Sequence, residues 1–160
     1  MQKFWRVFRD EEVVRRFKEI NYLEKDREFC RHDFQHFLDV ARILAILCFE
    51  NKFSFSRELI YITALLHDLG RVEEYLYGLN HALIGAEVAR EILEKYQEFV
   101  QEEIFLITEA IRGHREQNSE GFTRLLYLAD KLSRPCLACG VIDNCRKKEE
   151  MLLLHREKFY

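Results

Sequence analysis

A shortage of helix-breaking residues constrains this sequence more than any other feature. The chain has 160 residues but only one proline, Pro135, and six glycines. These are the two residue types that the interior of an α-helix tolerates least. Leu, Glu, Arg, Ala and Ile supply much of the remainder and favour helices, and we find neither strand-like alternation nor an internal repeat. The sequence therefore predicts an all-α fold.

Helical periodicity predicts about seven helices, separated by turns at glycines and by a loop that follows Pro135. The predicted segments cover residues 10–20, 29–50, 56–68, 81–96, 98–114, 122–133 and 146–158. Ser56 and Asn80 stand just before two of these segments. There a side-chain oxygen can accept a hydrogen bond from a first-turn amide, so these two residues support the predicted helix starts.

Composition and charge exclude several classes of protein. With 48% apolar and 33% charged residues, residues 1–160 are expected to form one globular domain. The net charge of −3 is spread along the chain, so we expect no nucleic-acid partner. Acidic residues interrupt the N-terminus from Asp10, and the most apolar stretch, 43–49, is far shorter than the roughly 18–20 residues of a membrane span. We therefore expect a cytoplasmic location and no membrane partner.

Six side chains with metal-binding atoms fall on the apolar stripes of predicted helices or directly after them: His36, His67, Asp68, His81, His114 and Asp130. Within the segment 29–50, for example, His36 shares one face with Phe29 and Val40. An apolar stripe points inwards, and a polar group there needs a partner. A single interior histidine is more often a hydrogen-bonded core residue than a ligand, but here four histidines and two aspartates are expected to converge.

Imidazole and carboxylate groups together suit divalent iron or manganese, with cobalt, nickel and zinc as alternatives. Six such groups exceed the needs of one tetrahedral site, so two metal ions are the economical interpretation. The carboxylate of Asp68 has two oxygens and can bridge two ions. Ions about 3.5 to 4 Å apart activate a shared water and hold a phosphate for in-line attack. The pattern therefore predicts metal-dependent hydrolysis.

Three motifs resemble those of the HD superfamily of metal-dependent phosphohydrolases: HFLDVAR at 36–42, LLHDLGR at 65–71 and YLADKL at 127–132. NHALIGAEVA at 80–89 and AIRGH at 110–114 resemble the additional histidine motifs of its dinuclear subset, particularly bacterial hydrolases that split diadenosine tetraphosphate symmetrically. The resemblance runs from about 28 to 134. It implies a compact single-domain helical bundle, to which the cysteine-containing loop 135–145 and the helix 146–158 are appended.

The resemblance also implies a division of the ligands between two ions. His36, His67, Asp68 and Asp130 would hold one ion, and Asp68 would bridge to a second ion held by His81 and His114. A metal-bridging hydroxide would then hydrolyse a phosphoester or phosphoanhydride in a small nucleotide-like substrate, with Asp68 as a catalytic residue.

Basic residues beside these motifs are candidates for substrate binding: Arg71, Arg112, Arg115 and Lys131. Arg71 stands where many HD enzymes carry lysine, and a guanidinium can hold two phosphate oxygens. We expect Arg71 and Lys131 also to assist catalysis, although surface basic residues often serve solubility alone. His32 precedes His36 by one predicted helical turn and is an alternative ligand by spacing, a supporting residue, or a core residue.

Five cysteines in a chain without an export signal indicate reduced thiols or metal ligands rather than disulfides. Cys136, Cys139 and Cys145 could hold zinc or an iron–sulfur cluster, which would staple the loop or sense redox state. A fourth ligand could be Cys30, Cys48 or His155, or come from a partner subunit. Small buried or free thiols are the alternative interpretation.

Two other functions fit the same sequence. The six-ligand pattern also resembles that of some HD-fold enzymes that use two irons to activate dioxygen on a small alcohol or phosphonate. A non-enzymatic sensor could instead use the metal pocket or the cysteines to bind a nucleotide or report redox state. The apolar run 151–154 could cap the bundle or pair with a second copy, so a homodimer is also compatible with the sequence.

Overall fold

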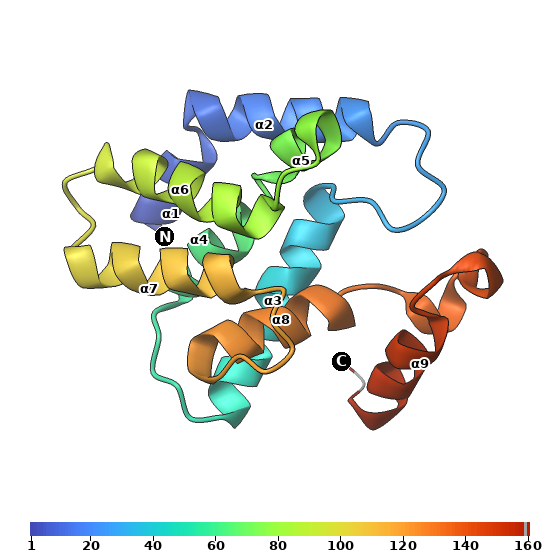
Figure 1. Ribbon diagram of the computed structural model, residues 1–160. Coiled ribbons are helices and arrows are strands. Elements are labelled where there is room, and N and C mark those ends of the chain that lie inside the picture. The colour runs from blue at the N-terminus through green and yellow to red at the C-terminus, as the bar shows by residue number, and fades with distance from the viewer. Residues whose placement is uncertain (159) are drawn as a thin grey trace.

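The computed structural model describes residues 1–158 and 160 (Figure 1). All the regular secondary structure in these residues is helical, as predicted. Its nine α-helices and two single-turn 3-10 helices in that part are α1 (Gln2–Phe8), α2 (Glu11–Leu23), α3 (Phe34–Glu50), α4 (Arg57–Leu66), α5 (Arg71–Tyr77), α6 (His81–Glu94), α7 (Gln101–Gly113), α8 (Gly121–Leu132), η1 (Cys136–Ala138), η2 (Ile142–Asn144) and α9 (Lys148–Glu157).

The short helices α1 and α5 are absent from the predicted set. Each has only seven residues, which is two turns and too short for a periodic apolar stripe to stand out. Helix α5 begins after Gly70 and ends at Gly78, whose backbone φ of 70° is left-handed and closes the helix. What the sequence suggested as a turn between two helices is therefore a helix of its own.

Helix α3 starts later than predicted. Asp33 caps its N-terminus by accepting a hydrogen bond from the His36 amide at 3.0 Å, so the helix begins at Phe34 rather than near residue 29. Phe29 and His32 consequently lie in the preceding loop. The predicted stripe that joined Phe29 to His36, and the helical spacing between His32 and His36, were both wrong.

The two predicted capping residues are confirmed. The hydroxyl of Ser56 accepts a hydrogen bond from the Leu59 amide at 3.1 Å, and the side chain of Asn80 accepts one from the Ala82 amide at 3.0 Å. These contacts fix the first turns of α4 and α6. Since α6 starts at His81, the Asn80 cap also sets the position of a candidate ligand.

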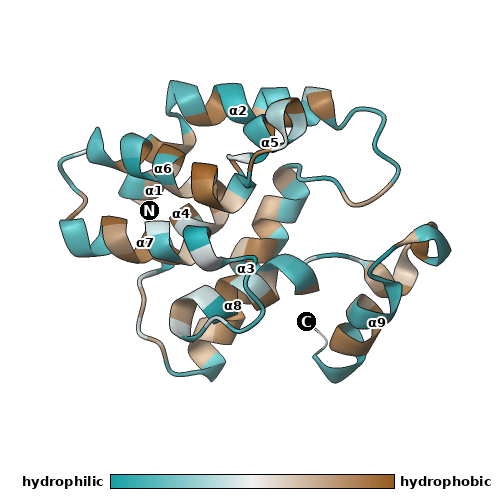
Figure 2. Cartoon of the chain, in the orientation of Figure 1, coloured by the Kyte–Doolittle hydropathy of each residue, from teal (hydrophilic) through white to brown (hydrophobic). Residues whose placement is uncertain are grey.

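The central helices enclose one apolar core. Helices α6 and α7 lie side by side, α3 packs on both α4 and α8, and α7 joins these pairs through contacts with α4 and α8 (Figure 1). Leu44, Leu66, Ile107 and Leu126 from four of these helices are completely buried. Hydrophilic residues run along the outer helix α2, whereas hydrophobic ones gather where α3 and α8 meet (Figure 2).

Residues 136–158, which we call the C-terminal lobe, stand at one side of this bundle (Figure 1). Its helix α9 packs mainly against η1, η2 and α8. Met151 of the predicted apolar run is buried, whereas Leu153 is exposed. Across the described residues, none of the helices combines the length and apolar character that crossing a membrane requires.

Candidate metal centre

The six predicted ligands come from five helices whose ends meet in one place. Their positions are His36 in the first turn of α3, His67 and Asp68 directly after α4, His81 at the start of α6, His114 directly after α7, and Asp130 near the end of α8. His67, His81 and His114 are each at most 2% exposed. Polar groups buried this deeply require partners, and the polar atoms nearest to their Nε2 atoms are mostly those of the other candidate ligands.

The first group consists of His36, His67, Asp68 and Asp130, and each residue offers one ligand atom within 4.8 Å of the others. Asp68 Oδ2 lies 3.1 Å from His67 Nε2 and 3.4 Å from His36 Nε2. Asp130 Oδ1 lies 3.4 Å from His36 Nε2. Two imidazoles and two carboxylates therefore face a common point.

The second group consists of Asp68, His81 and His114. Here the other oxygen of the same carboxylate takes part, because Asp68 Oδ1 lies 3.5 Å from His81 Nε2 and 3.9 Å from His114 Nε2. The two imidazole Nε2 atoms are 3.2 Å apart. Asp68 thus faces both groups, one oxygen to each, which is the geometry of a bridging carboxylate.

The opposite nitrogen of each of the four imidazoles lies beside an oxygen atom. His67 Nδ1 donates to the Ala64 carbonyl at 2.7 Å, and His114 Nδ1 donates to the Ile111 carbonyl at 2.6 Å. Because a carbonyl oxygen can only accept, Nδ1 of each ring carries a proton, and Nε2 is the nitrogen left to offer a lone pair to a metal. The rings are therefore held in the tautomer that binds a metal through Nε2.

His36 and His81 are oriented by side chains instead. The Ser133 hydroxyl lies 3.1 Å from His36 Nδ1 and donates its own hydrogen to the Asp130 carbonyl at 2.7 Å, so it accepts from the imidazole. Glu74 Oε2 lies 2.8 Å from His81 Nδ1. Carboxylates and hydroxyls behind a histidine are typical supports of metal ligands.

The unpaired atoms of this cluster fit divalent cations. His36 Nε2, His67 Nε2 and Asp68 Oδ2 are buried and have no hydrogen-bond partner. Leaving such a group unpaired costs about 1–3 kcal/mol, which a bound cation would offset. Two nitrogens bound to one first-row ion at about 2.1 Å stand about 3.0 to 3.4 Å apart, which matches the spacing of His81 and His114.

Charges around the cluster keep both aspartates ionised. Burial raises the pKa of Asp68, but Arg71 and His67 outweigh it and hold that pKa well below the usual range. Arg134 does the same for the pKa of Asp130 against its burial. Burial lowers the pKa of His67, whereas the two carboxylates together raise it to about 10. The first group thus attracts a positive charge.

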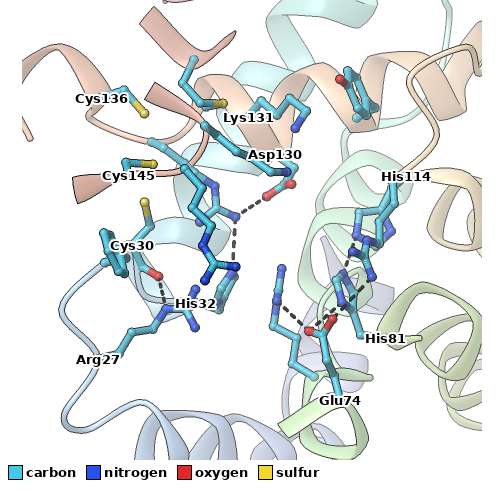
Figure 3. A pocket seen from close by; sticks show the side chains of 18 of the residues that line it. Arg27, Cys30, His32, Glu74, His81, His114, Asp130, Lys131, Cys136 and Cys145 are labelled. Carbon is cyan, nitrogen blue, oxygen red and sulfur yellow. Dashed lines mark hydrogen bonds and ion pairs between the residues drawn. The ribbon is translucent and has the colours of Figure 1, made fainter. Parts of the chain in front are cut away.

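A cavity of about 530 Å³ opens on this cluster (Figure 3). Asp130, His81 and His114 line it, together with a set of basic side chains: Arg27, Arg71, Arg115, Lys131, Arg134, Arg146 and Lys147. Lys131 lies 3.4 Å from Glu150, and Arg71 Nε donates to Asp68 Oδ1 at 2.8 Å. Such a wall is suited to a small anionic molecule.

The structure places three of the four predicted substrate-binding residues, Arg71, Arg115 and Lys131, on this cavity. Arg112 lies elsewhere, because two residues along a helix turn a side chain about 200° away from His114. Arg112 pairs with Glu87 at 2.6 Å and Glu109 at 3.1 Å on the outer surface. Its assignment to the substrate pocket is therefore corrected.

Glu24, Tyr75 and Arg134 were not predicted at the centre, and they surround His32, which the sequence suggested as an alternative ligand, a supporting residue or a core residue. His32 is buried, its Nδ1 lies 2.5 Å from Glu24 Oε1, and its Nε2 lies 3.8 Å from Asp68 Oδ2. Tyr75 also donates to Glu24. Arg134 donates to Asp130 Oδ1 at 2.7 Å. Only His32 had a sequence signal, its position beside His36, since the others reach the site from loops and a two-turn helix without a motif.

The cysteines divide into two sets. Cys30, Cys136 and Cys145 line the same cavity as the histidines, and Cys139 follows η1 nearby in the chain. Cys48 lies in the apolar core of α3 instead. Among the described residues, no three cysteine sulfurs lie within 4.8 Å of one another, so the thiols do not preform the site of a single ion.

Comparison with known proteins gives three matches. Residues 33–135 match the HD domain family. An uncharacterized protein of Clostridium beijerinckii is 43% identical over 150 residues, which are 94% of this chain and 95% of that one. A crystal structure described as a predicted HD superfamily hydrolase, from an uncultured Thermotogales bacterium, superposes with a TM-score of 0.65 at 25% identity and covers 92% of this chain and 81% of that one.

Proposed function

The chain belongs to the HD domain family, and from that premise we propose that it is a metal-dependent phosphohydrolase acting on a small nucleotide-like substrate. The observation that carries this proposal is the carboxylate of Asp68, whose two oxygens face two separate groups of imidazoles. A single structural ion would leave one of these groups unused. The arrangement therefore favours two adjacent ions and the dinuclear, diadenosine tetraphosphate hydrolase-like subset of the family.

We assign one ion to the first group and the other to the second group, with Asp68 in common. Iron or manganese suits this mixture of imidazole and carboxylate, and cobalt, nickel or zinc are alternatives. When bound, such ions lower the pKa of water and polarise phosphoryl oxygens. The protein contributes fixed ligand orientations through Ser133, Glu74 and two backbone carbonyls.

The basic wall of the cavity would bind the phosphoryl groups. Arg71 and Lys131 are each only 12% exposed at their side chains, and they lie beside the two groups of ligands. Their positive charges would stabilise a departing phosphate that carries negative charge. Arg115 stands further out and would contact a more distant phosphate. A phosphoester or phosphoanhydride bond next to the ions is thus the reaction that this wall supports.

His32 would serve to position Arg134 at the same site. Burial lowers its pKa to about 4 despite the nearby carboxylate of Asp68, so the ring is neutral near pH 7. With Nδ1 held by Glu24, the neutral ring accepts a hydrogen bond at Nε2 from Arg134 at 3.2 Å, and Arg134 also donates to Asp130.

Anaerobic turnover tests this function. Purified protein loaded with Mn²⁺ should hydrolyse dinucleoside polyphosphates or phosphomonoesters without oxygen. Asp68→Asn should lose more activity than the roughly 10- to 100-fold that removal of an outer partner costs. Arg112→Ala, on the outer surface, is the matched control and should keep wild-type rates.

Two results would overturn the proposal. Turnover that stops without oxygen would indicate the di-iron oxygenase that shares this ligand pattern. If the protein turns over none of the phosphorylated substrates, and if His67→Ala changes no measured rate, the protein is a sensor rather than an enzyme.

A further inference from the structure

Three of the five cysteines line the cavity, and a fourth, Cys139, follows Cys136 by three residues, although the chain brings them from two distant segments. Cys30 lies in the loop before α3, whereas Cys136, Cys139 and Cys145 belong to the lobe. Figure 3 shows the sulfur atoms of Cys30, Cys136 and Cys145 close together on the wall across from His81 and His114. The three lobe cysteines are one short of the four ligands of a typical cysteine site. The tertiary structure places Cys30 on the same cavity wall as Cys136 and Cys145.

The positions of the thiols distinguish Cys30 from Cys48. Cys30 lines the same cavity as Cys136 and Cys145 of the lobe. Cys48 lies on α3, is 1% exposed and is surrounded by the apolar core. Cys30 is therefore the cysteine outside the lobe that is placed to join the lobe cysteines.

Apart from the contacts that α9 makes with α8, including the Lys131–Glu150 ion pair, the lobe buries few side chains. Its residues 136–158 form two single-turn helices and one ten-residue helix, and only Cys136, Met151 and His155 are buried. Segments this small cannot bury enough apolar surface to order themselves and usually need a metal or a disulfide. All five cysteines are free thiols, so a metal-based link between the lobe and the bundle is the more suitable device.

The spacing of the thiols distinguishes between metal centres. Around a single zinc or iron ion with bonds of about 2.3 Å, four sulfurs would stand about 3.8 Å apart. No three of these sulfurs lie within 4.8 Å of one another. In an iron–sulfur cluster the thiolates are distributed over several irons and therefore stand further apart.

The charges nearby also suit a cluster with four thiolates, which is negative overall. Arg146 and Lys147 directly follow Cys145, and within residues 1–158 and 160 neither side chain pairs with a carboxylate. Arg27 donates to the Cys30 carbonyl at 2.8 Å and steadies the loop that carries this thiol. Cationic side chains therefore flank the thiols on both segments.

We propose that four cysteines bind one iron–sulfur cluster, which fastens the C-terminal lobe to the loop before α3: Cys30, Cys136, Cys139 and Cys145. Each thiol loses its proton when it binds iron. The cluster forms one wall of the cavity, and its ligands are separate from the six side chains of the His/Asp centre. Its presence is thus independent of the hydrolytic activity.

Iron and acid-labile sulfide in anaerobically purified or reconstituted full-length protein test the proposal. We expect about two to four sulfides per chain, with a matching amount of iron and the visible absorption of thiolate-bound iron. Cys30→Ala and Cys139→Ala should each lose most of the sulfide, whereas Cys48→Ala and His155→Ala should retain it. His67→Ala should also retain the sulfide, which distinguishes cluster iron from iron in the His/Asp centre.

A second measurement reports whether the lobe is fastened. Trypsin should cut after Arg146 or Lys147, both exposed, much faster in Cys30→Ala than in the wild type or in Cys48→Ala. Circular dichroism identifies any variant that fails to fold. If a variant does not fold, the sulfide content of the wild type still shows whether the protein binds an iron–sulfur cluster. Zinc without sulfide, no bound metal, disulfide bonds, or full sulfide retention in Cys30→Ala would each overturn the proposal.

Discussion

At the scale of single residues, the candidate centre depends on which ring nitrogen each histidine presents. All four imidazoles have Nδ1 beside an oxygen outside the cluster, and all four direct Nε2 into it. The acceptor is a backbone carbonyl for His67 and His114, whose positions at helix ends leave carbonyls one turn back within reach. His36 and His81 lie in first turns, where no such carbonyl is available, and they use Ser133 and Glu74.

Ser133→Ala should weaken metal binding at the first group by about 10- to 100-fold, because His36 loses the hydroxyl that fixes its ring. Calorimetric titration with Mn²⁺ measures this change. Ser119→Ala is the matched control, since the Ser119 hydroxyl likewise donates to the carbonyl three residues back but forms no hydrogen bond with a candidate ligand. Equal affinity in the two variants would contradict the assigned role of Ser133.

At the scale of the elements, the contact between α5 and α6 brings the two groups together. A Cβ atom added at Gly70 would stand 2.2 Å from the His81 carbonyl oxygen and 2.5 Å from the Gly85 amide nitrogen. Both atoms are backbone and cannot move aside cheaply. Glycine at this position therefore lets the first turn of α6 approach the segment that carries Asp68.

Gly70→Ala should displace His81 and destabilise the fold by about 1–3 kcal/mol through overpacking. We expect the second group to lose its metal while the first group keeps most of its affinity. Thermal unfolding and metal analysis measure the two effects. Gly140→Ala is the control, because an added Cβ there meets nothing within 4 Å. A Gly70 variant with wild-type stability would show that α6 shifts freely.

Asp10 joins α2 to the segment after α6, since it caps α2 and accepts hydrogen bonds from Tyr96 at 2.8 Å and from Lys95 at 3.1 Å. Burial raises its pKa, but Tyr96, Lys95 and the Glu12 amide together lower it below 3.8. As the pH falls, the Asp10 carboxylate is therefore protonated at a higher pH in the unfolded chain than in the folded protein. Asp10 thus contributes stability above about pH 4, and this contribution is lost as the pH falls through the folded pKa.

Asp10→Asn should therefore lower the free energy of unfolding by about 1 kcal/mol at pH 7 and show a shallower loss of stability below about pH 4. Denaturant unfolding at several pH values measures both. The exposed Asp26 provides the control variant Asp26→Asn. Parallel pH profiles for Asp10→Asn and the wild type would rule out this contribution of Asp10.

At the scale of the whole molecule, the polar cluster lies where the ends of five helices meet beside one apolar core. The carboxylates of Asp68 and Asp130 both face the first group, and their repulsion opposes folding unless cations lie nearby. Arg71 and Arg134 supply part of that charge. We therefore expect folding and metal binding at the candidate centre to be linked.

Removal of metal from the His/Asp centre should lower the melting temperature. A ligand at 100 times its Kd stabilises the folded state by about 2.7 kcal/mol, so added Mn²⁺ should restore a similar amount. Calorimetry of chelator-treated protein, with and without Mn²⁺, measures the change. In His67→Ala the response to Mn²⁺ should be much smaller. If Mn²⁺ leaves the melting temperature of the chelator-treated protein unchanged, folding and metal binding are not linked.

The sequence by itself determined the features that depend on local or motif-level information. Scarce proline and glycine fixed the all-α class, and the polar side chains of Ser56 and Asn80 marked two helix starts. Motifs in their order along the chain indicated the family and the six candidate ligands. Each of these features depends on residues that are close in sequence, where propensity and capping act.

Only the tertiary structure decided which distant side chains meet. Because Asp33 caps α3, His32 lies in the loop before the helix, where it contacts Glu24 and Arg134. Helix geometry places Arg112 on the outer surface. Cys30 lies more than a hundred residues before Cys136 in the chain, yet both line one cavity. Such encounters follow from how helices pack around a shared core, and neither the spacing nor the propensity of the separate segments contains that information.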